Sequence, residues 1–169
     1  MAFEPLRPIE SLLPTHEVDA FDCGKEPLNV FLRRFAFVNQ HNGSSRTYVT
    51  CRAMRVAGYY SLAVGSVMGE TAPPRVTKGL ARHPVPVMLL TRLAVDLTEQ
   101  RTGIGKGLQK DALLRTVQAA DIAGIRALLV HAKDETARAW YPAYDFEASP
   151  TDPLHLFLLL KDIRAIVGT

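Results

Sequence analysis

The stretch that decides the fold is "RLAVDLTEQRTGIGKG", residues 92–107. An apolar run ends there, and a loop rich in small residues leads directly into a long amphipathic segment. The first N–H groups of a helix have no intrahelical partner, and the helix dipole favours an anion beside them. Gly103 and Gly105 allow a ligand to approach the backbone closely. The junction therefore predicts a cradle for a pyrophosphate, with Arg101 and Lys106 adding positive charge.

The patterns on both sides of this junction predict one mixed α/β domain over residues 1–169, with a largely central sheet. Helical spacing and β-rich runs follow one another in the order β, α, β, β, β, α, β, α, β. The expected elements are an edge strand at 3–9, a helix at 25–40, a hairpin of strands at 46–52 and 56–67, a loop at 70–86, a buried strand at 85–96, a helix at 100–124, a strand at 125–132, a short helix at 134–144 and a final strand at 155–167.

Positive charge is concentrated in one span of the sequence. Residues 27–95 contain eight Arg and one Lys against a single acid, Glu70, so that the span carries +8 while the chain carries +3. Arginine suits bidentate contacts with phosphate, and such an imbalance predicts a polyanionic partner. The alternative is a solvated basic surface without a partner.

The remaining composition is typical of a globular protein of the cytosol, with 47% hydrophobic and 22% charged residues. No apolar run approaches the roughly 18 residues that span a membrane, and residues 1–10 lack the apolar core of a signal peptide. Cys23 and Cys51 form neither a metal motif nor a disulfide framework, so we expect both to be reduced. Nothing in the sequence has the spacing of metal ligands.

The six residues Gln100–Gly105 read Q-x-x-G-x-G and resemble the acetyl-CoA loop, [QR]-x-x-G-x-[GA], of the GNAT N-acetyltransferases. No phosphate loop and no dinucleotide fingerprint competes with it; the alternative is a glycine-rich turn without a ligand. The resemblance covers nearly the whole chain. Within the GNAT enzymes the chain is similar to one subgroup, the toxins of type II toxin–antitoxin modules, which acetylate aminoacyl-tRNA. The segments that carry it are "FDCGKEPLNVFL", "SSRTYV", "VAGYYSLAVGSV", "HPVPVMLLTRLAVD" and "ALLVHAKDETARAWY".

The resemblance implies the GNAT fold, in which a mixed central sheet with a splayed pair of strands is flanked by helices. It implies acetyl-CoA as co-substrate and no metal. The backbone of the strand before the loop would bind pantetheine, and an N–H there would polarise the thioester carbonyl. The loop would hold the pyrophosphate. The implied cofactor-binding residues are Leu93, Ala94, Val95, Gln100, Arg101, Thr102, Gly103, Ile104, Gly105 and Lys106.

The family pattern N-x-x-A-x-x-[FWLY]-Y-x-x-x-G-F, laid on residues 134–146, implies that Tyr141 is catalytic. Its hydroxyl would protonate the departing CoA thiolate; the alternative is a packed aromatic. Asp134 stands at the Asn position and Asp145 at the usual Gly, so both depart from the pattern. We expect Trp140 and Tyr144 to pack in the core.

The implied acceptor is the α-amine of an amino acid on charged tRNA. Acetylation of this amine would block translation. A free α-amine has a pKa of about 7.7–8.0, and the pKa is lower beside an ester. Much of the amine is therefore neutral at pH 7, and no strong base is needed. His83 and His131 could serve as a base in principle, but we expect a structural role for both; His131, in the strand before the helix at 134–144, remains a minor candidate. The resemblance also implies a homodimer, a ribbon-helix-helix antitoxin and, through the antitoxin complex, operator DNA. Candidate tRNA contacts are Arg33, Arg34, Arg46, Arg75, Lys78, Arg82 and Arg92.

Two other functions stay open. One is a GNAT enzyme that acetylates a small-molecule amine or a protein N-terminus, although the basic span disfavours a polycationic acceptor. The other is a non-catalytic regulator that binds acyl-CoA, against which Tyr141 and the intact loop argue.

Overall fold

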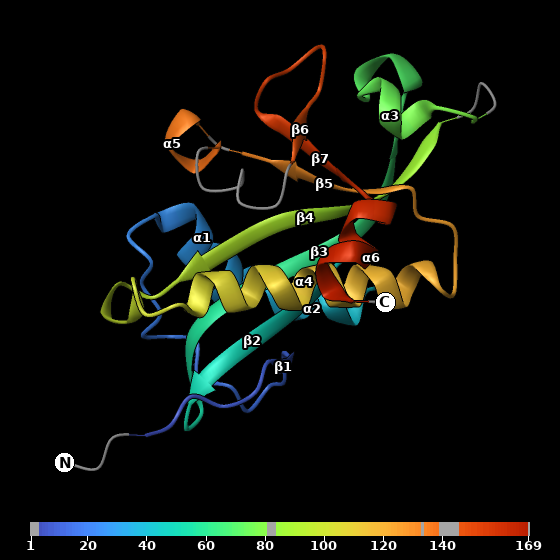
Figure 1. Ribbon diagram of the computed structural model, residues 1–169. Coiled ribbons are helices and arrows are strands. Elements are labelled where there is room, and N and C mark those ends of the chain that lie inside the picture. Colours follow the sequence, from blue (N-terminus) through green and yellow to red (C-terminus); the bar gives the residue numbers. More distant parts are fainter. Residues whose placement is uncertain (1–3, 81–83, 133, 139–145, 169) are drawn as a thin grey trace. The chain divides into compact units, whose positions relative to one another are not determined.

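The structure, a computed structural model, describes residues 4–80, 84–132, 134–138 and 146–168. The chain divides into two units. The N-terminal unit comprises residues 1–63 and 91–112, and the C-terminal unit comprises residues 64–90 and 113–169. Strands β3 (Arg55–Val67) and β4 (Val85–Val95) and helix α4 (Ile104–Ala120) each pass from one unit into the other (Figure 1).

The strands of the described residues form one seven-stranded sheet in the order β1-β2-β3-β4-β5-β7-β6. β4 and β5 are parallel, whereas β2 pairs with β3, and β5 with β7, in antiparallel fashion, so the sheet is mixed as predicted. The remaining strands are β1 (Glu10–Ser11), β2 (Arg46–Arg52), β5 (Ala127–His131), β6 (Glu147–Ala148) and β7 (His155–Leu159).

The N-terminal unit is built on the predicted hairpin of β2 and β3, which pair from Arg46↔Leu62 to Arg52↔Arg55. The helix expected at residues 25–40 is confirmed, but it contains three parts: α1 (Glu26–Val30), a π-helix (Phe31–Phe35) and α2 (Ala36–His41). The edge strand predicted at 3–9 is shorter and lies later in the chain: β1 comprises only Glu10 and Ser11. Between these elements lies a core of Leu12, Phe21, Cys23, Phe31, Leu32, Ala36, Val49, Cys51, Val56, Tyr59 and Ala94.

The C-terminal unit has a separate core, formed where β5 and β7 pair and where the short helix α3 (Pro74–Thr77) covers them. Arg75 on α3 contacts Glu147 at 3.0 Å and Asp162 at 3.1 Å, and so links three elements. Arg126 donates to the carbonyls of Val76 and Lys78. The core residues are Ala72, Val76, Val85, Val87, Ala127, Leu129, Phe157 and Leu159.

One sequence prediction for the end of the chain was wrong. The strand expected at 155–167 ends at Leu159, and α6 (Leu160–Val167) follows it. The apolar run "LFLLL" hid the change of period, because Leu160 and Ile163 already follow helical spacing and Ile163 is fully buried. Gly168, with φ of 81°, ends the helix in a left-handed conformation.

The boundaries of two other helices also differ from the prediction. α4 ends at Ala120, four residues before the expected stop at Gly124, and a turn fills the interval. α5 (Glu135–Arg138) confirms the start of the helix expected at 134–144, and the remainder of that helix lies outside the described residues. The sequence did not predict β6.

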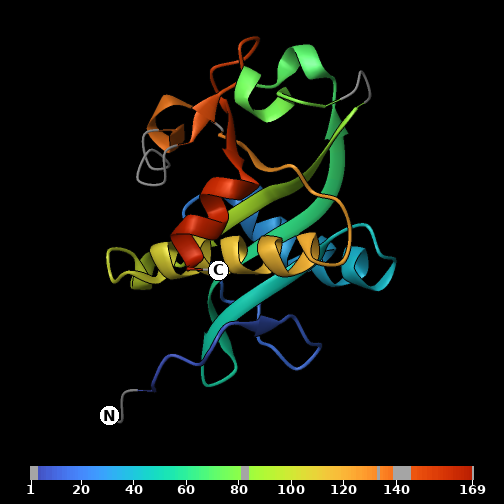
Figure 2. The same cartoon turned by 45° about the vertical axis from the view of Figure 1, so that its right-hand side comes forward.

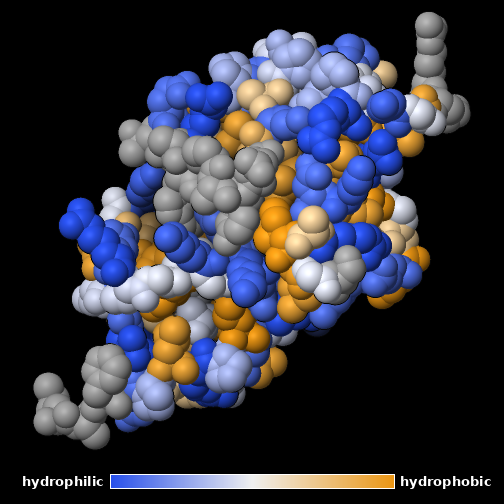
Figure 3. Space-filling model, in the orientation of Figure 1, coloured by the Kyte–Doolittle hydropathy of each residue, from blue (hydrophilic) through white to orange (hydrophobic). Residues whose placement is uncertain are grey.

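The surface in Figure 3 mixes blue hydrophilic residues with smaller orange hydrophobic patches. Within the described residues, no helix has the length and apolar character that crossing a membrane requires.

The C-terminal unit contains a stacked pair of histidines. The rings of His131 and His155 stack with centroids 4.0 Å apart at a cross-strand position of β5 and β7. Partial burial, and then the neighbouring His155, lower the pKa of His131, while Asp152 opposes the shift. The neutral ring is therefore favoured in the folded protein.

We expect this contribution to be complete above the unfolded pKa of 6.5 and to be lost as pH falls through the lower folded value. Thermal unfolding of the wild type and of His131→Gln, compared at pH 7.5 and pH 5.5, measures it. The variant should lose less stability on acidification than the wild type, and an equal loss in both proteins would contradict the assignment.

Candidate active site

The last residues of β4 leave one strand edge open. The parallel register with β5 runs from Val87↔Ala127 to Leu90↔Val130, whereas β4 itself continues to Val95. Among the described residues, the segment 91–95 has no ladder partner on that side. Its other side is occupied by β3, to which the Asp96 N–H donates at the Ala57 carbonyl. On that edge the backbone of Leu93 and Ala94 therefore has no ladder partner among the described residues, whereas the Val95 carbonyl accepts the Gln100 amide.

Asp96 shapes the turn that follows β4. Its carboxylate accepts the N–H of Asp22 at 3.0 Å, the N–H of Thr98 at 3.0 Å and the Thr98 hydroxyl at 2.7 Å. It thereby caps a 3-10 helix, Leu97–Glu99. Burial alone would raise the pKa of the Asp96 carboxyl, but these hydrogen bonds, together with the charge of Arg55, outweigh burial and lower it.

The loop is also fastened to the segment around Cys23. The Leu97 N–H donates to the Asp22 carbonyl at 2.8 Å. Gly24 has φ of 88°, and a Cβ there would lie 3.2 Å from the Leu97 side chain. The Gln100 amide donates to the carbonyls of Cys23 and Val95. The side-chain NH2 group of Gln100 thus helps to hold the loop in shape.

A buried ion pair between Arg52 and Glu99 holds the same loop against β2. Glu99 is 6% exposed, and its carboxylate contacts the Arg52 guanidinium at 2.5 Å. The Thr102 hydroxyl donates to the Glu99 carbonyl. Since breaking a buried pair leaves an uncompensated charge, this contact fixes the position of the residues just before α4.

The start of α4 fits a bound pyrophosphate. Arg101 has φ of 65° and Gly103 has φ of 91°, so the chain turns sharply before the helix. The left-handed conformation costs a non-glycine residue about 1–2 kcal/mol, which the surrounding contacts must hold in place. The first intrahelical bond runs from the Gly107 N–H to the Gly103 carbonyl, so the N–H groups of residues 103–106 precede it.

Open space borders this cradle. A Cβ built on Gly103 or Gly107 meets no heavy atom of the described residues within 4 Å, so these residues leave the backbone accessible to a ligand. Arg101 and Lys106 are exposed beside it. Ile104 is buried and so offers only its N–H. The residues present therefore fit the pyrophosphate of a CoA molecule, with two cations and backbone donors at a helix start.

Gly58 on β3 allows α4 to approach the sheet closely. A Cβ at this position would lie 3.0 Å from both Ile104 Cγ2 and Leu108 Cδ1, and 3.3 Å from the Ala94 carbonyl oxygen. Two branched side chains and a strand carbonyl therefore meet where only glycine leaves room. No sequence pattern indicated this contact, because the partners lie more than 30 positions away.

We expect Gly58→Val to displace the first turn of α4. Overpacking should lower the free energy of unfolding by about 1–3 kcal/mol and weaken acetyl-CoA binding. Chemical denaturation and calorimetric titration with acetyl-CoA measure the two effects. Gly124→Ala is the matched control, because a Cβ there meets nothing within 4 Å and should leave both values unchanged. Unaltered acetyl-CoA binding by Gly58→Val would contradict this role for Gly58.

The basic residues predicted to bind tRNA differ in how much of their charge is available. In the N-terminal unit, Arg34 is exposed without an ion pair among the described residues, whereas Arg33 contacts Glu26 at 2.8 Å. Arg46 donates to the Ser11 hydroxyl, and the Arg92 guanidinium lies 3.7 Å from the centre of the Phe31 ring.

In the C-terminal unit, Lys78 is exposed, and its side chain has no ion pair within the part of the chain that the structure describes. Arg75 is shared by two carboxylates and is the least available of the set. Arg82 lies outside the described residues.

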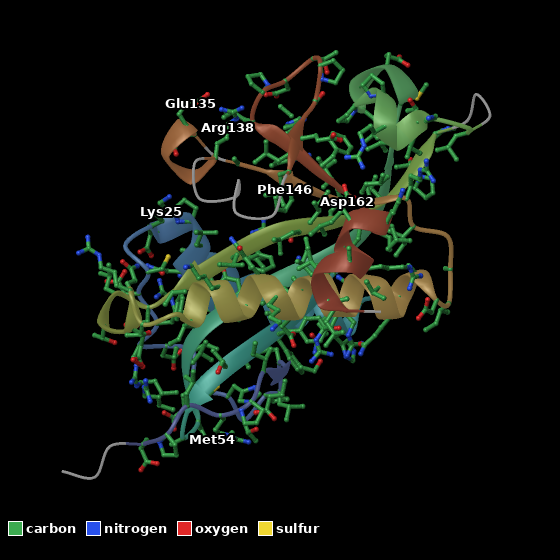
Figure 4. The ribbon with its side chains drawn as sticks, viewed as in Figure 1. Lys25, Met54, Glu135, Arg138, Phe146 and Asp162 are labelled. Atoms are coloured by element: carbon green, nitrogen blue, oxygen red, sulfur yellow. The ribbon has the colours of Figure 1, made fainter. Side chains whose placement is uncertain are left out.

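The predicted catalytic residue Tyr141 lies outside the described residues, as do Trp140, Tyr144, Asp145 and His83. The structure describes only the helix α5 that leads toward them. On this helix, Glu135 and Arg138, labelled in Figure 4, approach each other to 3.4 Å. The Arg138 N–H donates to the Asp134 carbonyl, so the helical turn begins where the sequence predicted it.

The cysteines are consistent with a reduced, structural role. Both Cys23 and Cys51 are free and buried. Burial is the main cause that raises the pKa of each thiol, that of Cys51 to about 11, so both remain protonated near neutral pH. Among the residues that the structure describes, no cluster of His, Cys, Asp and Glu side chains has the arrangement of a metal site.

Comparison with known proteins identifies the family. No family model matches the chain. A tRNA-acetylating toxin of Mycobacterium tuberculosis (strain ATCC 25618 / H37Rv) is 53% identical over 152 residues, which cover 90% of this chain and 91% of that protein. This chain belongs to the family of tRNA-acetylating toxins.

Solved structures of such toxins share the fold. AtaT complexed with acetyl-methionyl-tRNAfMet is 29% identical, with a TM-score of 0.88 over 96% of this chain and 99% of that chain. A mutant AtaT bound to acetyl-CoA and to the C-terminus of the antitoxin AtaR is 28% identical, with a TM-score of 0.81 over 97% and 99%. A KacTA–DNA complex is a further neighbour. The GNAT fold that the sequence predicted is confirmed for this tRNA-acetylating toxin homologue.

Proposed function

We propose that this chain is a toxin that transfers the acetyl group of acetyl-CoA to the α-amine of the amino acid on charged tRNA, and so blocks translation. The observation that carries the proposal is the open cradle at residues 96–106, in a chain 53% identical to a tRNA-acetylating toxin. The AtaT structures with acetyl-methionyl-tRNAfMet and with acetyl-CoA support the acceptor and the donor.

Each part of the site has a role in this reaction. The open backbone of Leu93–Val95 holds pantetheine, and an N–H there polarises the thioester carbonyl. The backbone of residues 100–106, with Arg101 and Lys106, holds the pyrophosphate. Because the α-amine is largely neutral near pH 7, positioning it against the thioester supplies most of the acceleration. As the N–C bond forms and the C–S bond breaks, the Tyr141 hydroxyl gives its proton to the sulfur, and the proton that the acetylated nitrogen loses restores the Tyr141 hydroxyl.

The basic residues contact the tRNA through phosphate groups, and such contacts weaken with added salt. Arg34 and Lys78 contribute most, since each is exposed without an ion pair among the described residues. Smaller contributions come from Arg33, Arg46 and Arg92, because some of their N–H donors already take part in contacts within the protein. Arg82 adds a further positive charge. Arg75 contributes least, because Glu147 and Asp162 already neutralise it.

The partners follow from the same family relationship. The protein acts in the cytosol as one domain and a homodimer, and an antitoxin of the ribbon-helix-helix type neutralises it. The complex of toxin and antitoxin binds operator DNA. The structures of AtaT with AtaR and of KacTA with DNA support an antitoxin and a DNA-bound complex.

Acetyl-CoA with a radioactive acetyl group tests the function directly. The expected result is label on charged tRNA and none on uncharged tRNA or on peptide. Label on a peptide or a small amine would replace the proposal by another acetyltransferase activity, and acetyl-CoA binding without any labelled acceptor would indicate a regulator. A panel of charged tRNAs then identifies the amino acid that the enzyme accepts.

A further inference from the structure

One polar atom inside the N-terminal unit lacks a partner. Gln109 on α4 is 5% exposed, and among the described residues its fully buried Nε2 atom has no hydrogen-bond partner. Because the atom is buried, solvent water does not supply an acceptor. A buried amide that donates to nothing lowers stability, since the group has given up its water without a hydrogen bond in exchange. By itself, the fold therefore leaves this donor unused.

The first turns of α4 pack closely on the sheet, and Figure 2 shows α4, in yellow and orange, lying across the strands. A Cβ on Gly58 of β3 would lie 3.0 Å from both Ile104 Cγ2 and Leu108 Cδ1. The same Cβ would lie 3.3 Å from the carbonyl oxygen of Ala94 on β4. Residues four apart share one side of a helix, so Ile104 and Leu108 form a stripe that faces the sheet at the level of Ala94.

Gln109 lies on the flank of α4 that is turned away from β2. On the other flank, the Tyr60 hydroxyl of β3 donates to the Asp111 carboxylate at 2.5 Å, and the Tyr60 ring stacks on Tyr48 of β2. At about 100° per residue, Gln109 is turned about 100° to one side of Leu108, and Asp111 about 60° to the other. Because the strands follow the order β2-β3-β4, the flank of Gln109 is the one nearer the open edge of β4.

The position of Gln109 along the helix also suits acetyl-CoA. Helical side chains lean toward the N-terminus of their helix, so the Gln109 amide lies beside the turn that precedes it. That turn contains the pyrophosphate cradle, with the N–H groups of residues 103–106. In CoA the pantoyl group, which carries a hydroxyl and an amide carbonyl, directly follows the pyrophosphate. An amide about one turn from the cradle therefore lies at the level of the first hydrogen-bond acceptors of pantetheine.

We propose that the Gln109 amide donates a hydrogen bond to the carbonyl oxygen of the pantoyl amide when acetyl-CoA binds. A turn about the last bond of the side chain directs its N–H groups from the interior to the edge of β4. The ligand thereby supplies the acceptor that the fold lacks among the described residues. Gln109 also fixes how far the thioester reaches along Leu93 and Ala94. The inference rests on the proposed function in taking acetyl-CoA as the ligand.

This contact distinguishes CoA from other phosphate ligands. The cradle holds a pyrophosphate through backbone N–H groups, Arg101 and Lys106, and these contacts are the same for any nucleoside diphosphate. A hydrogen bond from Gln109 exists only where a pantetheine arm follows the pyrophosphate. The truncated ligand 3′-phospho-ADP ends at the pyrophosphate and therefore lacks it.

Gln109→Met tests the contact, because methionine keeps the length and helix propensity of glutamine but donates no hydrogen bond. Calorimetric titration of both proteins with acetyl-CoA and with 3′-phospho-ADP separates the arm from the cradle. We expect the variant to bind acetyl-CoA about tenfold more weakly and 3′-phospho-ADP within about twofold of the wild type. Equal acetyl-CoA affinity in both proteins, or an equal loss for the two ligands, would overturn the proposal.

Thermal unfolding gives a readout that does not depend on activity. Because Gln109→Met removes an unpaired buried donor, its melting temperature without added acetyl-CoA should equal or exceed that of the wild type. The rise in melting temperature on adding acetyl-CoA should be smaller in the variant, and an equal rise would contradict the contact. Gln109→Leu, a second variant without the donor, should behave in the same way.

Gln118→Met is the matched control. Gln118 is exposed on the same helix, so this variant should keep the wild-type affinity for both ligands. A loss of acetyl-CoA affinity in Gln118→Met equal to that in Gln109→Met would show a general effect of the substitution on α4 and would overturn the proposal.

Acetyl transfer to charged tRNA is measured on the same proteins. A wild type that binds acetyl-CoA more tightly than Gln109→Met but labels no charged tRNA would refute the proposed function and leave the role of Gln109. A wild type that labels charged tRNA, but binds acetyl-CoA no better than Gln109→Met, would overturn the role of Gln109 and leave the function.

Discussion

Tyr141→Phe should lose acetyl transfer to charged tRNA by about 10²- to 10⁴-fold, the usual contribution of general acid catalysis. The substitution removes only the hydroxyl that protonates the departing thiolate. Acetyl-CoA binding, measured by calorimetry, should stay within about twofold of the wild type, since the cradle at residues 96–106 is untouched. Expression of the wild type should arrest growth, and expression of the variant should not.

Tyr144→Phe is the matched control, with the same change three residues away. It should keep both transfer and toxicity, because we assign Tyr144 to packing. If Tyr144→Phe loses activity while Tyr141→Phe retains it, the family pattern has been laid on the wrong tyrosine. If neither change matters, another group protonates the sulfur.

Asp96→Ala should have the second-largest effect, on both stability and acetyl-CoA binding. It leaves the N–H groups of Asp22 and Thr98 without their acceptor and removes the cap of the 3-10 helix. Unsatisfied groups and the lost cap should lower the free energy of unfolding by about 2–3 kcal/mol. Because the loop then loses its shape, the dissociation constant of acetyl-CoA should rise about tenfold, which corresponds to about 1.4 kcal/mol.

Asp96→Asn and Thr98→Val are milder changes that should reduce stability and acetyl-CoA binding to a smaller extent. The carboxamide keeps one acceptor oxygen, and valine removes only the hydroxyl donor, so both should lose less than Asp96→Ala. The lowered pKa of Asp96 means that its contribution is present above the unfolded value of 3.8 and is lost as pH falls through the folded value. The difference in free energy of unfolding between the wild type and Asp96→Asn should therefore shrink as the pH falls below 3.8. A difference that does not change as the pH falls would contradict the role of the carboxylate charge.

The sequence predicted the site as far as its features are local. β4 ends at Val95, one residue before the predicted end, whereas α4 starts at Ile104, four residues after the predicted start at 100. A strand end, a turn and a helix start depend on residues within a few positions of one another, so that one pattern contains them. Where two periods overlapped, as at Leu159 and Leu160, the prediction of a single strand was wrong.

Contacts between distant residues could not be predicted in this way. Asp22 and Asp96 are 74 positions apart, and Gln100 and Cys23 are 77 apart. The pattern assigned Gln100 to the ligand, whereas its amide donates to two loop carbonyls. Likewise, a list of basic residues does not say that Arg75 is held by two carboxylates while Arg34 is not.

By itself, the sequence determined the family, the order of the main elements and the strand–loop–helix junction at which we propose that acetyl-CoA binds, because these depend on local pattern. The tertiary structure alone decided what holds that loop: the Asp96 turn, the Arg52–Glu99 pair and the space at Gly58. It also revealed that the buried Gln109 amide has no partner for its Nε2 atom among the described residues, since burial depends on how α4 packs on the sheet. These features arise from which distant residues meet in the folded chain, and no local pattern records that.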